Sequence, residues 1–231
     1  MDQQPSKRDT YRDAVIVATG IVVIAWFIPG LAVLTTPINY LGTHTHELCH
    51  AVVALLTGAQ AIRVDVFADS SGVMHALGGA PSLVSMAGYL GATAIGAALI
   101  VSSRTEKGAK ASLRFLAGFV TLGSLLWLRG DLVGVLTGAL WIGALWLMAA
   151  KLNKGPLLFA AQFLGLQLCV ASIQSLMTLV NISALATRES DAENMAQMTG
   201  VPALVWAVTW CALGLMGIFV ALRFAWAKKS A

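Results

Sequence analysis

Six long apolar stretches constrain the fold of this chain more strongly than any other feature. They cover residues 14–37, 83–103, 111–128, 132–150, 156–183 and 201–226. Each is close to the ~20 residues that an α-helix needs to cross a bilayer, and a seventh stretch, 38–57, is less hydrophobic. Only 11% of the residues are charged, whereas soluble domains contain about a quarter. The sequence therefore predicts an all-α polytopic membrane protein with about six to seven transmembrane or re-entrant helices, in a single domain over residues 1–231.

The basic residues between these stretches indicate how the chain lies in the membrane. They gather in three places: Arg104, Lys107, Lys110 and Arg114 in one loop, Lys151 and Lys154 in another, and Arg223, Lys228 and Lys229 in the C-terminal tail. Two membrane crossings separate each group from the next. Loops rich in Lys and Arg stay in the cytoplasm, so segments 58–80 and 186–200 are predicted on the opposite side. The N-terminus then lies in the cytoplasm if 38–57 enters the membrane without fully crossing it. No basic stripe is interleaved with aromatic residues, so we expect no nucleic-acid partner.

The segment 58–80 has the pattern of a small β-hairpin. Ile62, Val64 and Val66 alternate with residues of a different character, which is the two-residue period of a strand. The sequence Asp-Ser-Ser-Gly at 69–72 is typical of a turn, and residues 73–77 can return as a second strand. We therefore expect a hairpin insertion at the membrane surface, with an irregular loop as the alternative.

The less hydrophobic stretch contains an HExxH motif, His46-Glu47-Leu48-Cys49-His50. Two histidines four residues apart lie on one face of a helix, where they can bind one zinc ion. The glutamate beside them is placed to accept a proton from a zinc-bound water that attacks a carbonyl. The alternative is a hydrogen-bond network between helices, but ionisable groups at membrane depth are usually functional, and such a network does not explain the spacing. The motif therefore predicts a zinc-dependent hydrolase.

A catalytic zinc site of this kind needs a third protein ligand and an open position for water. From the residues alone, the first candidate is Asp191 and the second is Asp131. Asp191 can instead belong to a helix start, because Ser190 and Glu193 have capping-box spacing, and Asp131 can instead pair with Arg129. The remaining candidates are Asp65, Asp69, His75 and Glu193.

Further stretches accompany the HExxH motif. They are HELCHAVVALLTG at 46–58, the hairpin segment, SMAGYLGATAIGA at 85–97, and Ser190-Asp191-Ala192 followed by Thr199-Gly200-Val201-Pro202 and Trp206. Together they resemble the site-2 protease family of intramembrane zinc metallopeptidases, in particular a bacterial branch. The resemblance implies a membrane-embedded metallopeptidase-like domain that binds zinc through His46, His50 and an aspartate of a later segment. It favours Asp191 as that aspartate and assigns Glu47 as the general base.

Two departures from the family pattern leave an alternative function open. Cys49 stands where the family usually has glycine, and the NPDG and LDG motifs of better-studied members are absent. We expect Cys49 to fill a close helix contact, with ligation by its thiolate as the alternative. The chain is therefore predicted to be a multi-pass zinc metalloendopeptidase of the cell membrane, acting on a membrane protein or peptide. The alternative is a proteolytically inactive binding or regulatory relative; a metal transporter fits less well, because the histidines cluster in one place.

The predicted hairpin also suggests a substrate-binding element. A transmembrane helix must unwind before water can reach its peptide bonds. An exposed strand edge at Ile62, Val64 and Val66 could hold the unwound segment by β-augmentation. The alternative is that the hairpin only packs over the site.

Overall fold

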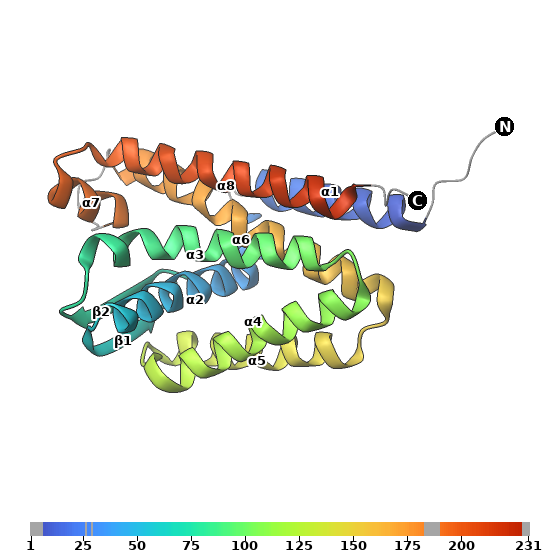
Figure 1. Cartoon of the computed structure of the whole chain (residues 1–231), viewed down its shortest axis with the longest axis horizontal. Helices are drawn as coiled ribbons and strands as arrows, with labels where there is room; N and C mark the ends of the chain where they lie inside the picture. Colours follow the sequence, from blue (N-terminus) through green and yellow to red (C-terminus); the bar gives the residue numbers. More distant parts are fainter. Residues whose placement is uncertain (1–6, 26, 29, 183–189, 228–231) are drawn as a thin grey trace.

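The chain folds into a bundle of long helices with one small hairpin at its end (Figure 1). The computed structural model describes residues 7–25, 27–28, 30–182 and 190–227. The helices in this part are α1 (Lys7–Ala25), α2 (Ala32–Leu56), α3 (Pro81–Ser102), α4 (Glu106–Trp127), α5 (Leu132–Lys151), α6 (Lys154–Ile182), α7 (Asp191–Thr199) and α8 (Ala203–Trp226), and the strands are β1 (Gln60–Val66) and β2 (Gly72–Leu77). The predicted mostly helical membrane fold with a hairpin after the HExxH helix is confirmed.

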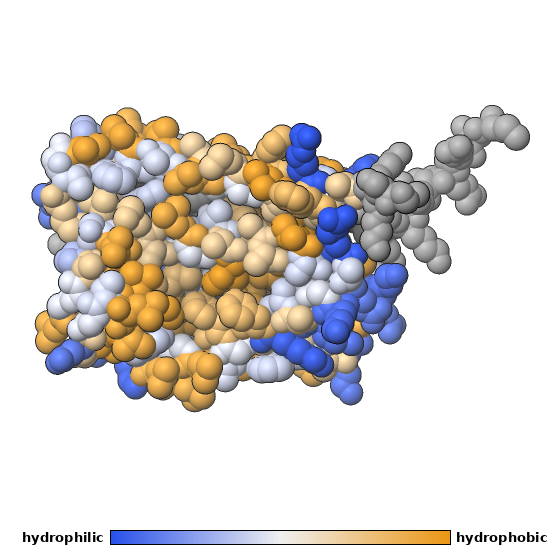
Figure 2. All heavy atoms as spheres, viewed as in Figure 1, coloured by the Kyte–Doolittle hydropathy of each residue, from blue (hydrophilic) through white to orange (hydrophobic). Residues whose placement is uncertain are grey.

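Among the described residues, four helices, α3, α4, α5 and α8, are long and apolar enough to cross a membrane. Figure 1 shows the hairpin and α7 at one end of the bundle, and the loop between α3 and α4 with the end of α8 at the other. Hydrophilic residues gather at this second end, and hydrophobic residues cover much of the face between the two ends (Figure 2). The helix α1 also begins at this second end, where the loop between α3 and α4 lies. The arrangement therefore fits the predicted separation of the basic loops from the hairpin.

The first two helices divide at a different place from the one predicted. The expected boundary lay between residues 37 and 38, but α1 ends at Ala25 and α2 already begins at Ala32. Gly30 has a φ of +86°, a left-handed conformation that interrupts a helix and suits glycine. Pro37 lies inside α2, in its second turn, where proline removes one helical hydrogen bond, to the carbonyl of Val33. The HExxH helix is consequently 25 residues long, about 37 Å at 1.5 Å per residue.

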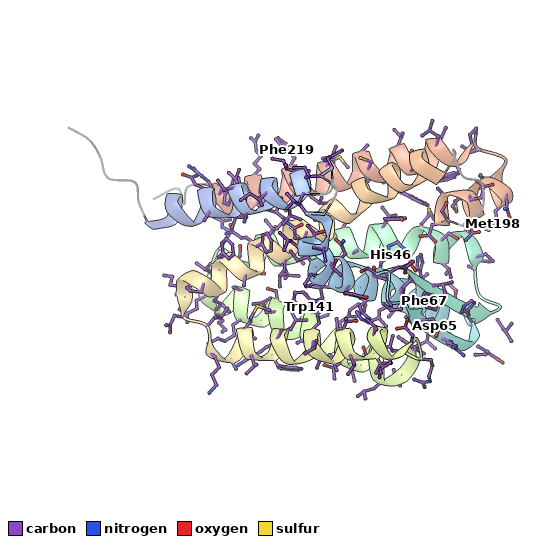
Figure 3. All side chains as sticks on the ribbon, turned by 180° about the vertical axis from the view of Figure 1, so that it is seen from behind. His46, Asp65, Phe67, Trp141, Met198 and Phe219 are labelled. Carbon is purple, nitrogen blue, oxygen red and sulfur yellow. The ribbon has the colours of Figure 1, made fainter. Side chains whose placement is uncertain are left out.

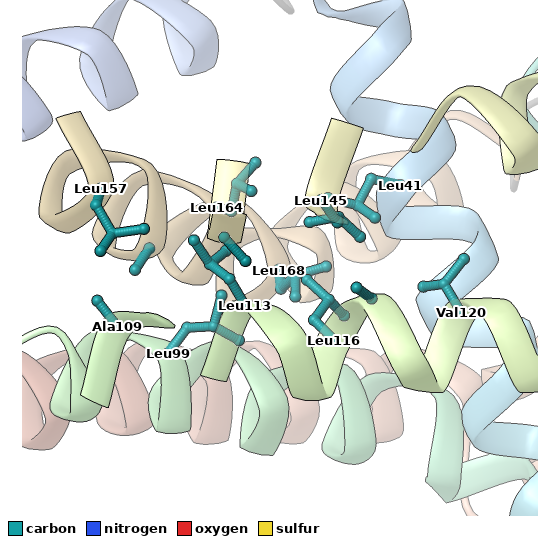
Figure 4. Packing of buried hydrophobic residues seen from close by; sticks show 13 residues of the cluster. Leu41, Leu99, Ala109, Leu113, Leu116, Val120, Leu145, Leu157, Leu164 and Leu168 are labelled. Atoms are coloured by element: carbon teal, nitrogen blue, oxygen red, sulfur yellow. The ribbon is translucent and has the colours of Figure 1, made fainter. Parts of the chain in front are cut away.

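The helix that carries the motif occupies the centre of the bundle. Within the described part, α2 packs against both strands and every helix except α7 and α8. The neighbouring apolar core (Figure 4) is formed mainly by leucines of α3 to α6, among them Leu99, Leu113, Leu145 and Leu164, with Leu41 of α2. A central, tightly packed helix of this kind holds its side chains in fixed directions.

The hairpin lies against the middle of α2. Its strands are antiparallel, with Val64 opposite Met74 and Val66 opposite Gly72. The side chains of Tyr40 and Thr43 donate hydrogen bonds to the carbonyls of Ala68 and Ser70 in the turn, each at 2.7 Å. These bonds fix the turn beside the HExxH residues.

Candidate metal centre

His46 and His50 point to one place, as their spacing on a helix requires. Their Nε2 atoms lie 2.9 Å apart, and the two rings meet nearly at right angles. Figure 3 shows His46 in the interior of the bundle, among α2, α3 and the hairpin. Two imidazole nitrogens therefore converge at a site enclosed by three elements.

A backbone carbonyl sets the tautomer of His50. Its Nδ1 lies 2.5 Å from the carbonyl oxygen of Val84, near the beginning of α3. A carbonyl only accepts, so Nδ1 carries a proton, and Nε2 is the ring nitrogen that is left to bind a metal ion. A hydrogen bond of this kind orients metal-binding histidines in many proteins.

Asp191 brings a carboxylate to the two histidines from a distant part of the chain. Its Oδ2 lies 3.0 Å from Nε2 of His46 and 3.2 Å from Nε2 of His50. Asp191 is the first residue of α7, and the hydroxyl of Ser190 caps this helix by accepting a hydrogen bond from the backbone of Glu193. Residues 191–199 thus form a separate helix where we expected a loop, because the cap starts a helix at this point. Residues 186–189 of the predicted loop lie outside the described residues.

A tight corner between α7 and α8 accounts for the Thr-Gly-Val-Pro stretch and the tryptophan after it. Gly200 ends α7 with a φ of +73°. The hydroxyl of Thr199 donates to the carbonyl of Met195 and accepts from Nε1 of Trp206 at 3.2 Å. This corner ties the orientation of α7 to α8.

The surroundings keep the Asp191 carboxyl ionised. Burial alone would raise its pKa, but the charge on His50 and the hydrogen bonds from both imidazoles outweigh that effect. The pKa of Asp191 therefore lies well below its usual value, and the group is an anionic donor.

These three side chains fit a zinc ion. Their ligand atoms all lie within 4.8 Å of one another, and no other such group of His, Cys, Asp and Glu occurs in the described part of the chain. Tetrahedral zinc with bonds of about 2.0–2.1 Å separates its ligand atoms by about 3.3 Å, close to the 2.9 to 3.2 Å found here. Three protein ligands leave one position for water or substrate, as in catalytic zinc sites.

Gly88 lets α3 lie directly against the two imidazoles. A methyl group at this position would stand 2.5 Å from Nε2 of both His46 and His50. From the sequence, Gly88 is expected to allow close approach of another helix, but its contact with the imidazoles was not foreseen. The sequence also gave no sign of the Val84 carbonyl, since every residue has one.

Glu47 lies beside the histidines and under the hairpin. It is 6% exposed, and a Cβ atom added to Gly72 would meet its Oε1 at 2.9 Å. The absence of a side chain at Gly72 therefore gives the carboxylate its place next to the two histidines.

Asp131 does not join this cluster. Its two carboxylate oxygens accept hydrogen bonds from the backbone of Gly134, at 2.8 Å, and Ala68, at 2.9 Å. The residue caps α5 and fixes the hairpin turn. Two of the other acidic candidates have local partners: Asp65 pairs with Arg63, and Asp69 accepts a hydrogen bond from Ser71. Glu193 lies exposed in the first turn of α7. The side chain of His75 is 60% exposed, 3.8 Å from Asp65.

The remaining polar residues of the HExxH helix have packing roles. Cys49 is buried against Gly91 of α3, which has no side chain to displace its sulfur. His44 faces away from the cluster, and its Nε2 lies 3.3 Å from the hydroxyl of Thr137. His44 does not cap a helix start, because α2 begins twelve residues earlier, at Ala32.

The predicted substrate-binding edge of β1 is already occupied. The carbonyl of Val64 accepts a hydrogen bond from the backbone of Arg129 at 2.8 Å, and Gly130 packs on the backbone of Val66. Val64 and Val66 are fully buried, while Ile62 packs partly buried beside them. Ile62, Val64 and Val66 therefore do not form a free edge, because the loop between α4 and α5 covers it.

The opposite edge of the hairpin borders an open groove of about 310 Å³. Strand β2, the start of α3 and the helix α7 line it, with Met74, Ala76, Val84, Ser85, Asn194 and Met198 among the lining residues. The carbonyl of Val64 bonds to Arg129 and so points away from β2. Val64 and Met74 are therefore a pair without mutual hydrogen bonds, in which the N–H and C=O of Met74 point away from β1. Ala76, two residues further along the strand, points its N–H and C=O to the same side. The groove therefore joins a free strand edge to the carbonyl that holds His50.

Comparison with known proteins gives one match. A model of the family described as peptidase M50B-like matches residues 16–221. This range includes α2, the hairpin and α7. No curated protein matches the chain, and no solved structure does.

Proposed function

The chain belongs to the peptidase M50B-like family, of the site-2 protease type, and on this premise we propose that it is a multi-pass zinc metalloendopeptidase of the cell membrane. In this proposal His46, His50 and Asp191 hold the zinc ion and Glu47 is the general base. The proposal goes beyond what the family and the four apolar helices already indicate, which is a membrane protease.

One observation carries the proposal. A carboxylate 145 positions away in the sequence meets the two HExxH imidazoles at 3.0 and 3.2 Å. A network that served only to join helices would not need three zinc-type donors at one point, next to a buried glutamate. The donor set and the open position suit catalysis rather than a closed structural site.

The chain's own residues account for most of the proposed reaction. Zinc held by this donor set supplies Lewis acidity, which polarises a peptide carbonyl and lowers the pKa of water. Glu47 accepts a proton from the attacking water and delivers it to the leaving amine when the peptide C–N bond breaks. The Val84 carbonyl keeps His50 oriented, and the hairpin turn shields Glu47 from bulk water.

The groove beside β2 is the proposed place for the substrate. We propose that an unwound segment of a membrane protein lies there in extended form and pairs with the backbone of Met74 and Ala76. Main-chain pairing provides affinity without requiring one particular sequence. The groove ends at Val84 and Ser85 of α3 and at α7, so a segment bound in it passes close to the three donor groups.

Replacing Ala76 with proline should weaken substrate binding more than catalysis. Proline removes one outward N–H and is tolerated on a strand edge. Because a hydrogen bond contributes ~0.5–1.5 kcal/mol, we expect KM for a membrane-inserted peptide substrate to rise about two- to tenfold, with kcat and zinc content unchanged. An unaltered KM would show that the substrate does not pair with this strand.

The metal content of the purified protein tests the proposed function. We expect about one zinc ion per chain by elemental analysis, and hydrolysis of a membrane-inserted substrate that stops on chelation and returns with zinc. Gly88→Ala should abolish both zinc binding and hydrolysis, since its methyl group would collide with the Nε2 atoms of both histidines. Gly118→Ala is the matched control, because nothing lies within 4 Å of a Cβ atom at that position.

The outcomes separate the proposal from its alternative. A wild-type chain that contains no zinc and takes none up would contradict the proposed enzyme. It would favour the proteolytically inactive binding or regulatory relative, which needs no stoichiometric metal. A Gly88→Ala variant that keeps zinc and activity would contradict the location of the site.

A further inference from the structure

Apart from the contacts of Asp191 with His46 and His50, the helix α7 does not pack against the helix that carries the histidines. In the described part of the chain, α7 packs against α3 and α8, and its backbone does not approach that of α2. It is nine residues long, too short to be stable alone. The position of the Asp191 carboxylate therefore depends on what α3 and α8 present to α7.

Two tryptophans of α8 contact α7: Trp206 bonds to Thr199 at its end, and Trp210 packs nearer its start. The buried residues of α8 are Ala207, Gly214, Ala221, Ala225 and Trp210, so Trp210 is the only bulky one. It is 2% exposed and forms a cluster with Ala192 and Met195, the two buried residues of α7. Ala192 follows Asp191 directly. The indole thus packs against the part of α7 that carries the carboxylate.

The same indole is linked to the first histidine. Tyr89 of α3 stacks on Trp210 with ring centroids 5.1 Å apart and an angle of 28°. Tyr89 also meets the ring of His46 edge to face, with ring centroids 4.4 Å apart. Stacked and edge-to-face pairs at such distances have preferred geometries and contribute beyond the area that they bury. A chain of ring contacts therefore runs from Trp210 to His46.

We propose that Trp210 is a positioning residue of the metal centre. It holds α7 so that Asp191 reaches the imidazoles, and through Tyr89 it fixes the ring of His46. This inference rests on the proposed zinc site. In this proposal Trp210 does not touch the donor atoms. It acts on Asp191 by packing against α7 and on His46 by stacking on Tyr89.

The test compares Trp210→Ala and Trp210→Phe with Leu145→Ala in the full-length protein in detergent. Leu145 is fully buried in α5, within a different apolar cluster, so its loss controls for a weakened core. Cobalt(II) is the probe, because its visible absorption reports both affinity and ligand geometry. Hydrogen exchange of the metal-free protein gives a second readout of α7 itself.

We expect Trp210→Ala to weaken cobalt binding about tenfold or more, as loss of an outer-shell partner does, and to alter the visible spectrum. Trp210→Phe should fall between it and the wild type, since one ring remains to stack. The Leu145→Ala variant should lower the unfolding temperature but bind cobalt within about twofold of wild type, because the cluster of Leu145 contains none of the three donor residues. In the metal-free protein, Trp210→Ala should speed exchange in α7 and leave α4 unchanged.

A Trp210→Ala variant with wild-type affinity, spectrum and exchange in α7 would overturn the inference. So would equal losses of affinity in Trp210→Ala and Leu145→Ala. If Trp210→Ala does not fold, Trp210→Phe decides by the same comparison. A wild-type protein that binds neither cobalt nor zinc would overturn the proposed function and the inference with it, whereas wild-type binding with no effect at Trp210 overturns the inference alone.

Discussion

Replacing Glu47 with glutamine is expected to abolish peptide-bond hydrolysis while zinc stays bound. Glutamine has nearly the same shape, so it fits the space that Gly72 leaves beside the hairpin. It cannot accept the proton of the attacking water, and general acid–base catalysis contributes about 10²- to 10⁴-fold to a rate. The loss should appear in kcat, because Glu47 is not among the proposed ligands.

The measurement combines a cleavage assay in liposomes with elemental analysis of the same preparation. Glu106→Gln is the control, because Glu106 is an exposed acid in the first turn of α4, and it should leave the rate unchanged. A Glu47→Gln variant that cleaves at the wild-type rate would refute the proposed role of Glu47. Loss of zinc together with activity would instead mean that Glu47 supports the site structurally.

The sequence predicts the helices well because membrane insertion depends on local composition. A stretch of ~20 apolar residues has few alternatives to a helix in a bilayer, where every backbone polar group needs an internal partner. The boundary between α1 and α2 was missed for a related reason. Both helices are apolar, so hydropathy does not separate them, and the Pro-Gly pair at 29–30 was not taken as a break.

The HExxH part of the site is also local, because two imidazoles on successive turns of a helix share a face whatever the rest of the chain does. The third donor is not local. Asp191 and Asp131 both lie at the start of a helix. The sequence pattern does not tell which of these two helix starts lies next to the histidines of α2. Gly72 and Gly88 were missed for the same reason, since their importance comes from contacts with other elements. The edge of β1 was misjudged because the loop that covers it lies more than 60 residues away.

The two aspartates provide the second large expected effect. Asp191→Ala should remove zinc and activity together, whereas Asp131→Ala should keep zinc and lose stability. Each residue lies at the start of a helix, Asp191 as the first residue of α7 and Asp131 as the cap of α5. The pair is therefore matched for the favourable effect of a carboxylate on a helix start.

The magnitudes follow from what each carboxylate contacts. Asp191 contributes one of the three donor groups, so its loss should weaken zinc binding by more than the ~10–100-fold typical of an outer-shell partner. Asp131 accepts hydrogen bonds from Gly134 and Ala68, and losing a helix cap costs about 0.5–2 kcal/mol of folding free energy. Zinc competition titrations and unfolding measurements on both variants distinguish the two roles. Tight zinc binding by Asp191→Ala, with zinc lost from a still-folded Asp131→Ala, would reverse the assignment, because only a carboxylate that reaches the imidazoles can complete the site.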